Sequence, residues 1–177
     1  MNTSRIAPVV LENYSHMWPG MFETEKNIIL GVIGEDIISI EHIGSTSIPG
    51  MIAKPEIDIL IGVSDLSKAG PCVIKLKDIA YAYYPRFEEF EPRRRYFRKS
   101  DGIVPLVHVH LYQENTSEYR ERLLFRDFLR QHPEEAATYA AYKTSLLQTL
   151  GSDRLAYSDA KERFVLDMLE NLRKVTK

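Results

Sequence analysis

The sequence predicts an α+β fold, with helices packed on one face or end of a mixed β-sheet and a C-terminal helical region. Short runs of β-branched and aromatic residues, which favour strands, dominate residues 37–112, whereas residues 117–175 carry apolar side chains at helical spacing. One helix, a strand-rich region and three more helices, in that order, are typical of α+β domains. No linker or repeat divides the 177 residues, so we expect one domain over 1–177, with a helix and β core over 1–115 and three helices over 116–177.

The elements of the first part follow from local signals. Pro19 is expected at the first position of a helix that runs to about Val32 and ends at Gly34. A helix over residues 66–80 is expected to kink or restart at the Gly-Pro pair 70–71, because proline disrupts a helix interior. β-Branched and aromatic runs predict strands at residues 37–43, 57–63, 81–84, 95–99 and 104–112.

The last third of the chain predicts three helices, over residues 117–130, 133–150 and 158–175. Pro133 opens the second of them with two glutamates in its first turn, and Gly151 ends it. Ser158 and Asp159 are the expected N-cap candidates of the last helix, since their side chains accept from backbone N–H groups.

Composition narrows the classes of function. The net charge is −2, so no general attraction to nucleic acid is expected. Cys72 is the single cysteine, which excludes an internal disulfide and suits a reducing compartment. No secretory signal and no apolar run of membrane-spanning length is present, so a cytoplasmic protein without a membrane partner is expected.

The segment 41–63, EHIGSTSIPGMIAKPEIDILIGV, is the most informative stretch of the chain. Glu56 and Asp58 are separated by one residue, and on a strand both carboxylates would share a face, where Mg²⁺ could bind them together with substrate phosphates. The turn before them offers hydroxyls and backbone N–H groups to a phosphate, from Gly44, Ser45, Thr46 and Ser47. The alternative is a tight turn between two core strands with a solvated acidic face.

A cluster of arginines lies at residues 93–98. Alternation divides it between two faces, Arg93 with Arg95 and Arg94 with Arg98. We expect Arg93 and Arg95 to face the cleft that holds Asp58 and to bind polyphosphate, for which the guanidinium fork is well suited. A charged edge strand that resists aggregation is an equal alternative.

Two histidines, His108 and His110, also share a strand face and could ligate a metal or donate to phosphate. A structural pair of histidines is the alternative, and zinc lacks a closed pattern of four ligands. Lys161 and Tyr157 could complete a phosphate site, although such residues are more often helix surface. Arg126 and Arg130 are interpreted as helix-surface residues. The Walker A, serine-hydrolase and Rossmann motifs are absent.

With these residues assembled, the chain resembles the GrpB family almost from end to end. The resemblance rests on Trp18-Pro19, EHIGSTSIPG at 41–50, AKPEIDI at 53–59, RRRYF at 93–97, HVH at 108–110, LLFRDFLRQHPE at 123–134 and YSDAK at 157–161. It implies a polymerase-β-like nucleotidyltransferase core, in which a Gly-Ser turn holds a triphosphate and a carboxylate pair binds Mg²⁺. Gly44 and Ser45 match the turn, and Asp58 pairs either with Glu56 or with the position of Leu60.

The resemblance leaves two main functions open, and an interaction protein with a vestigial pocket is a third possibility. One is an Mg²⁺-dependent nucleotidyltransferase that moves a nucleoside monophosphate from a triphosphate to an acceptor, with Asp58 and Glu56 on the metal, His110 in a catalytic role, and Lys54 balancing charge. The other is a degenerate module that binds a nucleotide or another phosphorylated molecule, such as a coenzyme A relative. The third carboxylate that usually completes the site in the polymerase-β-like superfamily is missing, since the later strand offers His108 and His110 instead.

Overall fold

The computed structural model describes residues 9–99, 106–151 and 153–175. The helices are α1 (Trp18–Ile33), α2 (Gly70–Asp78), α3 (Ser117–Gln131), α4 (Pro133–Leu150) and α5 (Arg154–Val175). The strands are β1 (Ser39–Ile43), β2 (Ile57–Val63), β3 (Ala82–Tyr83), β4 (Arg94–Lys99) and β5 (Val107–Gln113). Among these residues, no helix is both long and apolar enough to cross a lipid bilayer.

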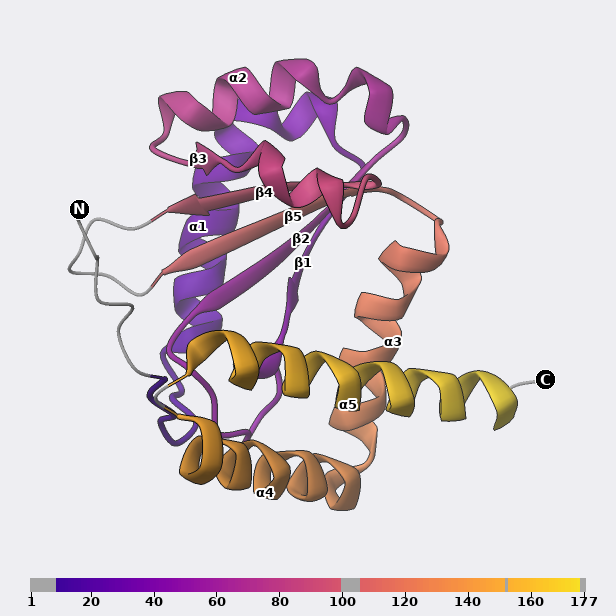
Figure 1. Ribbon diagram of the computed structural model, residues 1–177. Coiled ribbons are helices and arrows are strands. Elements are labelled where there is room, and N and C mark those ends of the chain that lie inside the picture. Colours follow the sequence, from indigo (N-terminus) through magenta and orange to yellow (C-terminus); the bar gives the residue numbers. More distant parts are fainter. Residues whose placement is uncertain (1–8, 100–105, 152, 176–177) are drawn as a thin grey trace, which may run out of the picture.

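The five strands form one mixed sheet in the order β1-β2-β5-β4-β3 (Figure 1). β2 and β5 are parallel neighbours, and the other adjacent pairs are antiparallel. The α+β class and the mixed sheet predicted from the sequence are therefore confirmed. The parallel pairing places Asp58 of β2 opposite His108 of β5, at the centre of the sheet.

One face of the sheet is the main hydrophobic core. Alternate residues of β2, from Ile57 to Val63, are fully or almost fully buried there, together with Phe97 of β4 and Val109 of β5. Helix α1 runs behind this face, and α2 packs beside it (Figure 1). Because side chains alternate across a strand, the residues between these apolar positions all project to the opposite face.

The opposite face is covered by the C-terminal helices only in part. Helix α3 packs against β1, β2 and β5, and its Tyr119 is buried with Leu60 and Tyr112. Helices α4 and α5 pack on each other and on α3 near the end of the sheet where β1 ends and β2 begins (Figure 1). A further cluster, including Met51 and Tyr139, joins α4 to the loop that follows β1.

One predicted helix break is confirmed, and one predicted helix start is wrong. The helix expected over 66–80 divides into a 3₁₀ turn, Leu66–Lys68, and α2, because the chain restarts at Gly70 as the proline requires. The last helix begins at Arg154, so the expectation that Ser158 and Asp159 cap it is wrong. Asp153 caps it instead, since its Oδ1 accepts from the backbone N–H groups of residues 155 and 156 at 3.1 and 3.0 Å. Residues 104 and 105 of the last expected strand lie outside the described residues.

Candidate functional site

The turn after β1 lies directly against the carboxylate of Asp58. Gly44 has φ +71°, and a Cβ at this position would come within 2.2 Å of Asp58 Oδ2. Both facts require glycine, because other residues are strained at positive φ and none could fit beside the carboxylate. The chain then forms a 3₁₀ turn, Ser45–Ser47, in which Ser47 Oγ donates to the Gly44 carbonyl at 2.7 Å.

The hydroxyls expected to hold phosphate are engaged unequally. Thr46 is buried, and its Oγ1 donates to the carbonyl of Glu56 at 3.0 Å, which fastens the turn to the start of β2. Ser47 is buried as well and is satisfied within the turn. Gly44 and Ser45 are only partly buried. Of the four residues, these two are therefore the ones that remain accessible to a ligand.

Lys143 of α4 is a site residue that the sequence interpretation missed. Its side chain is 2% exposed, and its Nζ donates to Ser45 Oγ at 3.0 Å and to the carbonyl of Ile52. Burial, together with a smaller effect of the charge of Lys161 on α5, lowers the pKa of this amine to about 7. A signal was present in the sequence, since Lys143 shares an apolar helix face with Tyr139 and Leu146, both of which are buried.

At the centre of the sheet face, Asp58 meets both histidines of β5. Asp58 Oδ1 lies 3.4 Å from His108 Nδ1 and 3.5 Å from His110 Nε2. Burial opposes ionisation of Asp58, but the polar contacts and charge of the two nearby imidazoles hold its pKa well below the usual value. Burial lowers the pKa of His110 to about 4, even though Asp58 acts in the opposite direction.

Glu56 is not part of this group. Its carboxylate forms ion pairs with Lys54 and Arg154, each at 2.9 Å. Burial opposes ionisation of Glu56, but its pKa is lowered, mainly by the charge and hydrogen bond of Lys54 and also by the charge of His108. The chain turns between Lys54 and Glu56, and β2 begins only at Ile57, so the strand alternation expected to align Glu56 with Asp58 does not extend to it.

The donors around Asp58 do not fit the Mg²⁺ ion that the sequence led us to expect. Within the described residues, the histidine, cysteine and carboxylate groups whose ligand atoms lie within 4.8 Å of one another are Asp58, His108 and His110. Mg²⁺ prefers oxygen ligands in octahedral geometry, whereas two of these three donors are imidazole nitrogens. Glu56, the expected second oxygen ligand, is engaged in its ion pairs.

The arginine strand has the opposite orientation to the one we predicted. In the register of β4 with β5, Arg98 lies opposite His108, and Arg94 lies opposite Tyr112, so both arginines share the face of Asp58. Arg95 lies opposite Leu111 and therefore on the other face. The expectation that Arg95 lines the cleft is wrong. Alternation divides the arginines as predicted, but which face is inward depends on the pairing register.

The two arginines once expected in the cleft have other partners. Arg95 pairs with Glu88 at 3.0 Å. Arg93 precedes the strand, is largely exposed and pairs with Glu118 of α3 at 3.0 Å. The Arg93 pair is typical of a charged surface, where an ion pair contributes up to about 1 kcal/mol, whereas the Arg95 pair is partly buried.

Unpartnered polar atoms gather on the face of Asp58. Among the described residues, four buried side-chain nitrogens have no hydrogen-bond partner: Arg94 Nε, Arg98 Nε, His108 Nε2 and His110 Nδ1. The strand register places all four residues on this one face, around Asp58. Buried polar groups are normally satisfied, so this concentration marks the face as a place where a ligand or water completes the structure.

Two arginines of α3 hold the turn in place. Arg126 Nη1 donates to the carbonyl of His42 at 3.0 Å and pairs with Glu41 at 2.7 Å, and its side chain is buried. Arg130 donates to the carbonyl of Ser47 from Nε and Nη2, at 3.0 and 2.8 Å. The interpretation as a helix-surface residue is therefore wrong for Arg126, whereas Arg130 is exposed, as expected, and still reaches the turn. They fasten α3 to β1 and to the turn beside Asp58.

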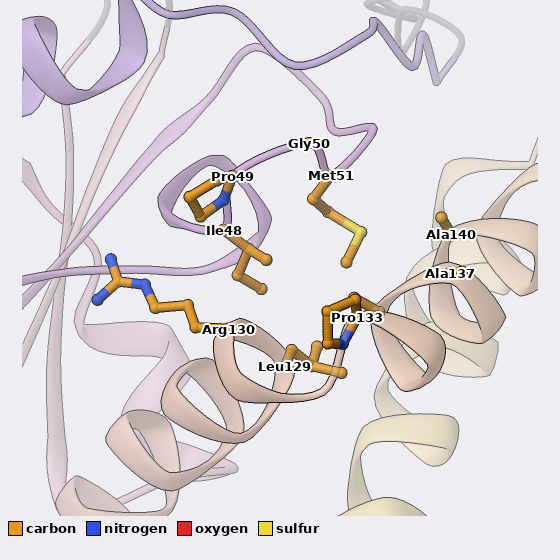
Figure 2. A pocket seen from close by; sticks show the side chains of 10 residues that line it. Ile48, Pro49, Gly50, Met51, Leu129, Arg130, Pro133, Ala137 and Ala140 are labelled. Atoms are coloured by element: carbon orange, nitrogen blue, oxygen red, sulfur yellow. The ribbon is translucent and has the colours of Figure 1, made fainter.

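A separate hollow lies behind the same turn. It has a volume of about 480 Å³ and is lined mainly by apolar residues of the loop 48–51 and of the junction between α3 and α4. Figure 2 shows Met51 and Pro133 at this hollow, with the guanidinium of Arg130 pointing away from them. Asp58 and the histidines are not among its lining residues, so the polar sheet face remains the candidate site.

Comparison with known proteins places these residues in a family. The family model described as GrpB protein matches residues 8–171. The UPF0157 protein YqkA of Bacillus subtilis is 37% identical over 91% of this chain, and the chain spans 46% of the length of YqkA. A dephospho-CoA kinase of Mycolicibacterium paratuberculosis is 28% identical over 91% of this chain and 45% of its own length. The crystal structure of conserved protein GrpB from Enterococcus faecalis superposes with a TM-score of 0.83, at 33% identity, over 95% of this chain and all of that one. The chain belongs to the GrpB family.

Proposed function

We propose that this protein binds a nucleotide or another phosphorylated small molecule on the sheet face around Asp58. The observation that carries the proposal is the position of Arg94 and Arg98, which lie on this face with buried Nε groups that have no hydrogen-bond partner in the described parts of the chain. Planar guanidinium groups bind phosphate oxygens through paired N–H donors, and such charge-assisted bonds are among the stronger polar contacts.

The charges on this face favour Arg98 as the principal anion contact. Arg94 pairs with Glu91 at 3.0 Å, and the basic groups of Lys54 and Arg154 both pair with Glu56. The guanidinium of Arg98 instead lies over the ring of Tyr84, 5.7 Å from its centroid. Arg98 and Tyr84 also line a hollow of about 360 Å³, so a cation and an aromatic ring border the same space. Phosphate on the guanidinium and a base against the ring would use both groups.

The mycobacterial relative suggests a class of ligand. It is named as a dephospho-CoA kinase, and the region similar to this chain makes up 45% of its length. Coenzyme A and dephospho-CoA combine an adenine ring with phosphates, which suits an aromatic and arginine-lined face. We therefore propose a coenzyme A-related nucleotide as the first ligand to test.

Nucleotidyl transfer is the second candidate. It is supported by the close approach of the Gly44 turn to Asp58 Oδ2, which brings a potential phosphate cradle next to a carboxylate. Against it stand the ion pairs that occupy Glu56 and the histidines where the family's third acid would lie. Binding without turnover is therefore the function that the geometry supports better.

Ligand titration with paired variants tests the proposal. Dephospho-CoA and ATP are titrated calorimetrically into the wild type, Arg98→Ala and Arg95→Ala. Loss of one guanidinium–phosphate contact should weaken binding by roughly 10- to 100-fold in Arg98→Ala, because such a contact contributes about 1.5–3 kcal/mol. Arg95→Ala is the matched control on the other face of the same strand and should bind as the wild type does.

Equal effects of the two variants, or no binding of either nucleotide by the wild type, would refute the proposed site. Release of pyrophosphate from ATP, measured with Mg²⁺ or Mn²⁺ in the same preparations, tests the second candidate. Release that disappears in Asp58→Asn would establish transfer rather than binding alone.

A further inference from the structure

We infer that Asp58, His108 and His110 form a binding site for one divalent transition-metal ion, of the Zn²⁺ or Fe²⁺ type. The donor atoms come from two adjacent parallel strands and lie within 4.8 Å of one another. Two imidazoles and one carboxylate are a donor set preferred by transition metals that are intermediate between hard and soft Lewis acids. This inference does not depend on the proposed function, because the metal can be tested without any phosphorylated ligand.

The spacing of the donors fits a shared ion better than it fits direct hydrogen bonds. Asp58 Oδ1 lies 3.4 Å from His108 Nδ1 and 3.5 Å from His110 Nε2. N–H···O bonds are usually 2.7–3.2 Å long, so both contacts are too long to be strong hydrogen bonds. Tetrahedral donors at about 2.1 Å from a central Zn²⁺ are about 3.4 Å apart. Both histidines therefore already stand at the distance from Asp58 that a common ion requires, and all three donor atoms lie within 4.8 Å of one another.

The rings are held in the orientation that this site needs. Tyr96 of β4 is buried and packs against both imidazoles, with ring centroids 5.7 Å from His108 and 5.2 Å from His110. Asp58 is anchored by β2, and its second oxygen, Oδ2, lies beside the Gly44 turn, while Oδ1 faces the histidines. Because these donor groups are already fixed in place, little conformational entropy is lost when a metal binds.

The solvent exposure of Asp58 and the lack of hydrogen-bond partners behind the two rings, among the described residues, indicate what kind of metal site this would be. The side chain of Asp58 is 27% exposed, so the ion could keep a position open to water or to a ligand. The distal ring nitrogens, His108 Nε2 and His110 Nδ1, have no hydrogen-bond partner among the described residues. Loss of such outer partners typically weakens metal binding by 10- to 100-fold. The geometry thus points to an open, exchangeable site rather than a closed structural one.

Metal titration of the full chain tests the inference. Zn²⁺ binding is measured by equilibrium dialysis, and Co²⁺ is used as a spectroscopic probe, because its visible absorption reports nitrogen and oxygen coordination. The wild type should bind one equivalent of each ion. His108→Ala and His110→Ala should each lose more than about 100-fold in affinity, which exceeds the effect of removing an outer partner. His16→Ala, which removes an exposed histidine from another part of the chain, should bind normally.

A second measurement keeps the inference testable if the histidine variants do not fold. In the wild type, a Zn²⁺ titration followed by ¹⁵N NMR should shift His108 Nδ1 and His110 Nε2, the two ring nitrogens that face Asp58. Shifts confined to other histidines, or no stoichiometric Zn²⁺ binding, would overturn the inference. It would also fail if Mg²⁺ bound tightly through Asp58 while both histidine variants kept full affinity, because that result would indicate an oxygen-ligand site.

Discussion

Replacing Lys143 with methionine should change how the stability of this protein depends on pH. Lys143 is buried, and its pKa is lowered from 10.5 to about 7, chiefly by burial. The unfolded chain therefore binds this proton more tightly than the folded chain does. Because proton binding is linked to unfolding, the contribution of Lys143 to the free energy of unfolding rises with pH between about 7 and 10.5. Below about pH 7 this contribution is constant, because the amine is protonated in both states.

The magnitude follows from the two pKa values. A proton that is bound only in the unfolded state changes the free energy of unfolding by about 1.4 kcal/mol per pH unit. At pH 7 the amine of the folded protein is still half protonated, so the change is smaller near that pH. Integration from pH 7 to pH 9 gives a gain of about 2 kcal/mol for the wild type. Lys143→Met also loses the contacts with Ser45 and Ile52, but that cost does not depend on pH. The slope, rather than the absolute difference, is therefore diagnostic.

Urea denaturation followed by circular dichroism at pH 7, 8 and 9 measures this slope. The difference in unfolding free energy between the wild type and Lys143→Met should change by about 2 kcal/mol across the interval, in favour of the wild type at high pH. Lys77→Met is the matched control, because it removes an exposed lysine from α2. A wild-type slope that matches the slopes of both variants would refute the assignment of Lys143 as a buried amine with a lowered pKa.

Two further predictions concern the turn and its anchors. Gly44→Ala should destabilise the protein by more than the roughly 1–2 kcal/mol of left-handed strain expected for Gly50→Ala, because only at Gly44 would the new methyl group collide with Asp58; equal losses in urea denaturation would contradict the close approach. Arg126→Met should cost about 2 kcal/mol by leaving a buried carbonyl of β1 without its donor, whereas Arg120→Met on the exposed side of α3 should change stability by less than about 0.5 kcal/mol. Comparable thermal melting of these two variants would show that α3 is not fastened to β1 through Arg126.

The group formed by Asp58, His108 and His110 shows how much of the site the local sequence pattern can predict. Side chains alternate on a strand, so Asp58 had to share its face with Leu60, and His108 with His110. The turn at Gly44 was also predictable, since glycine followed by hydroxyl residues marks a tight turn. That Asp58 and His108 lie opposite each other depended on β2 and β5 becoming parallel neighbours, which is a property of the whole sheet.

The remaining site residues were decided by tertiary structure. Alternation separated Arg95 from Arg94 and Arg98, but only the register of β4 on β5 determined which set faces Asp58. Glu56 has the sequence spacing of a metal ligand, yet a turn just before β2 directs it to Lys54 and to a partner 98 residues away in the chain.

The sequence by itself determined the α+β class, the positions of most helices and strands, and which strand residues share a face, because these depend on short-range spacing and on the burial of apolar side chains. Only the tertiary structure decided that Lys143 and Arg130 reach the turn beside Asp58. A polar side chain on a helix has the same local pattern whether it is solvated or pairs with a distant carbonyl. Its role depends on which helix face packs against the sheet, and that packing is set by the whole chain.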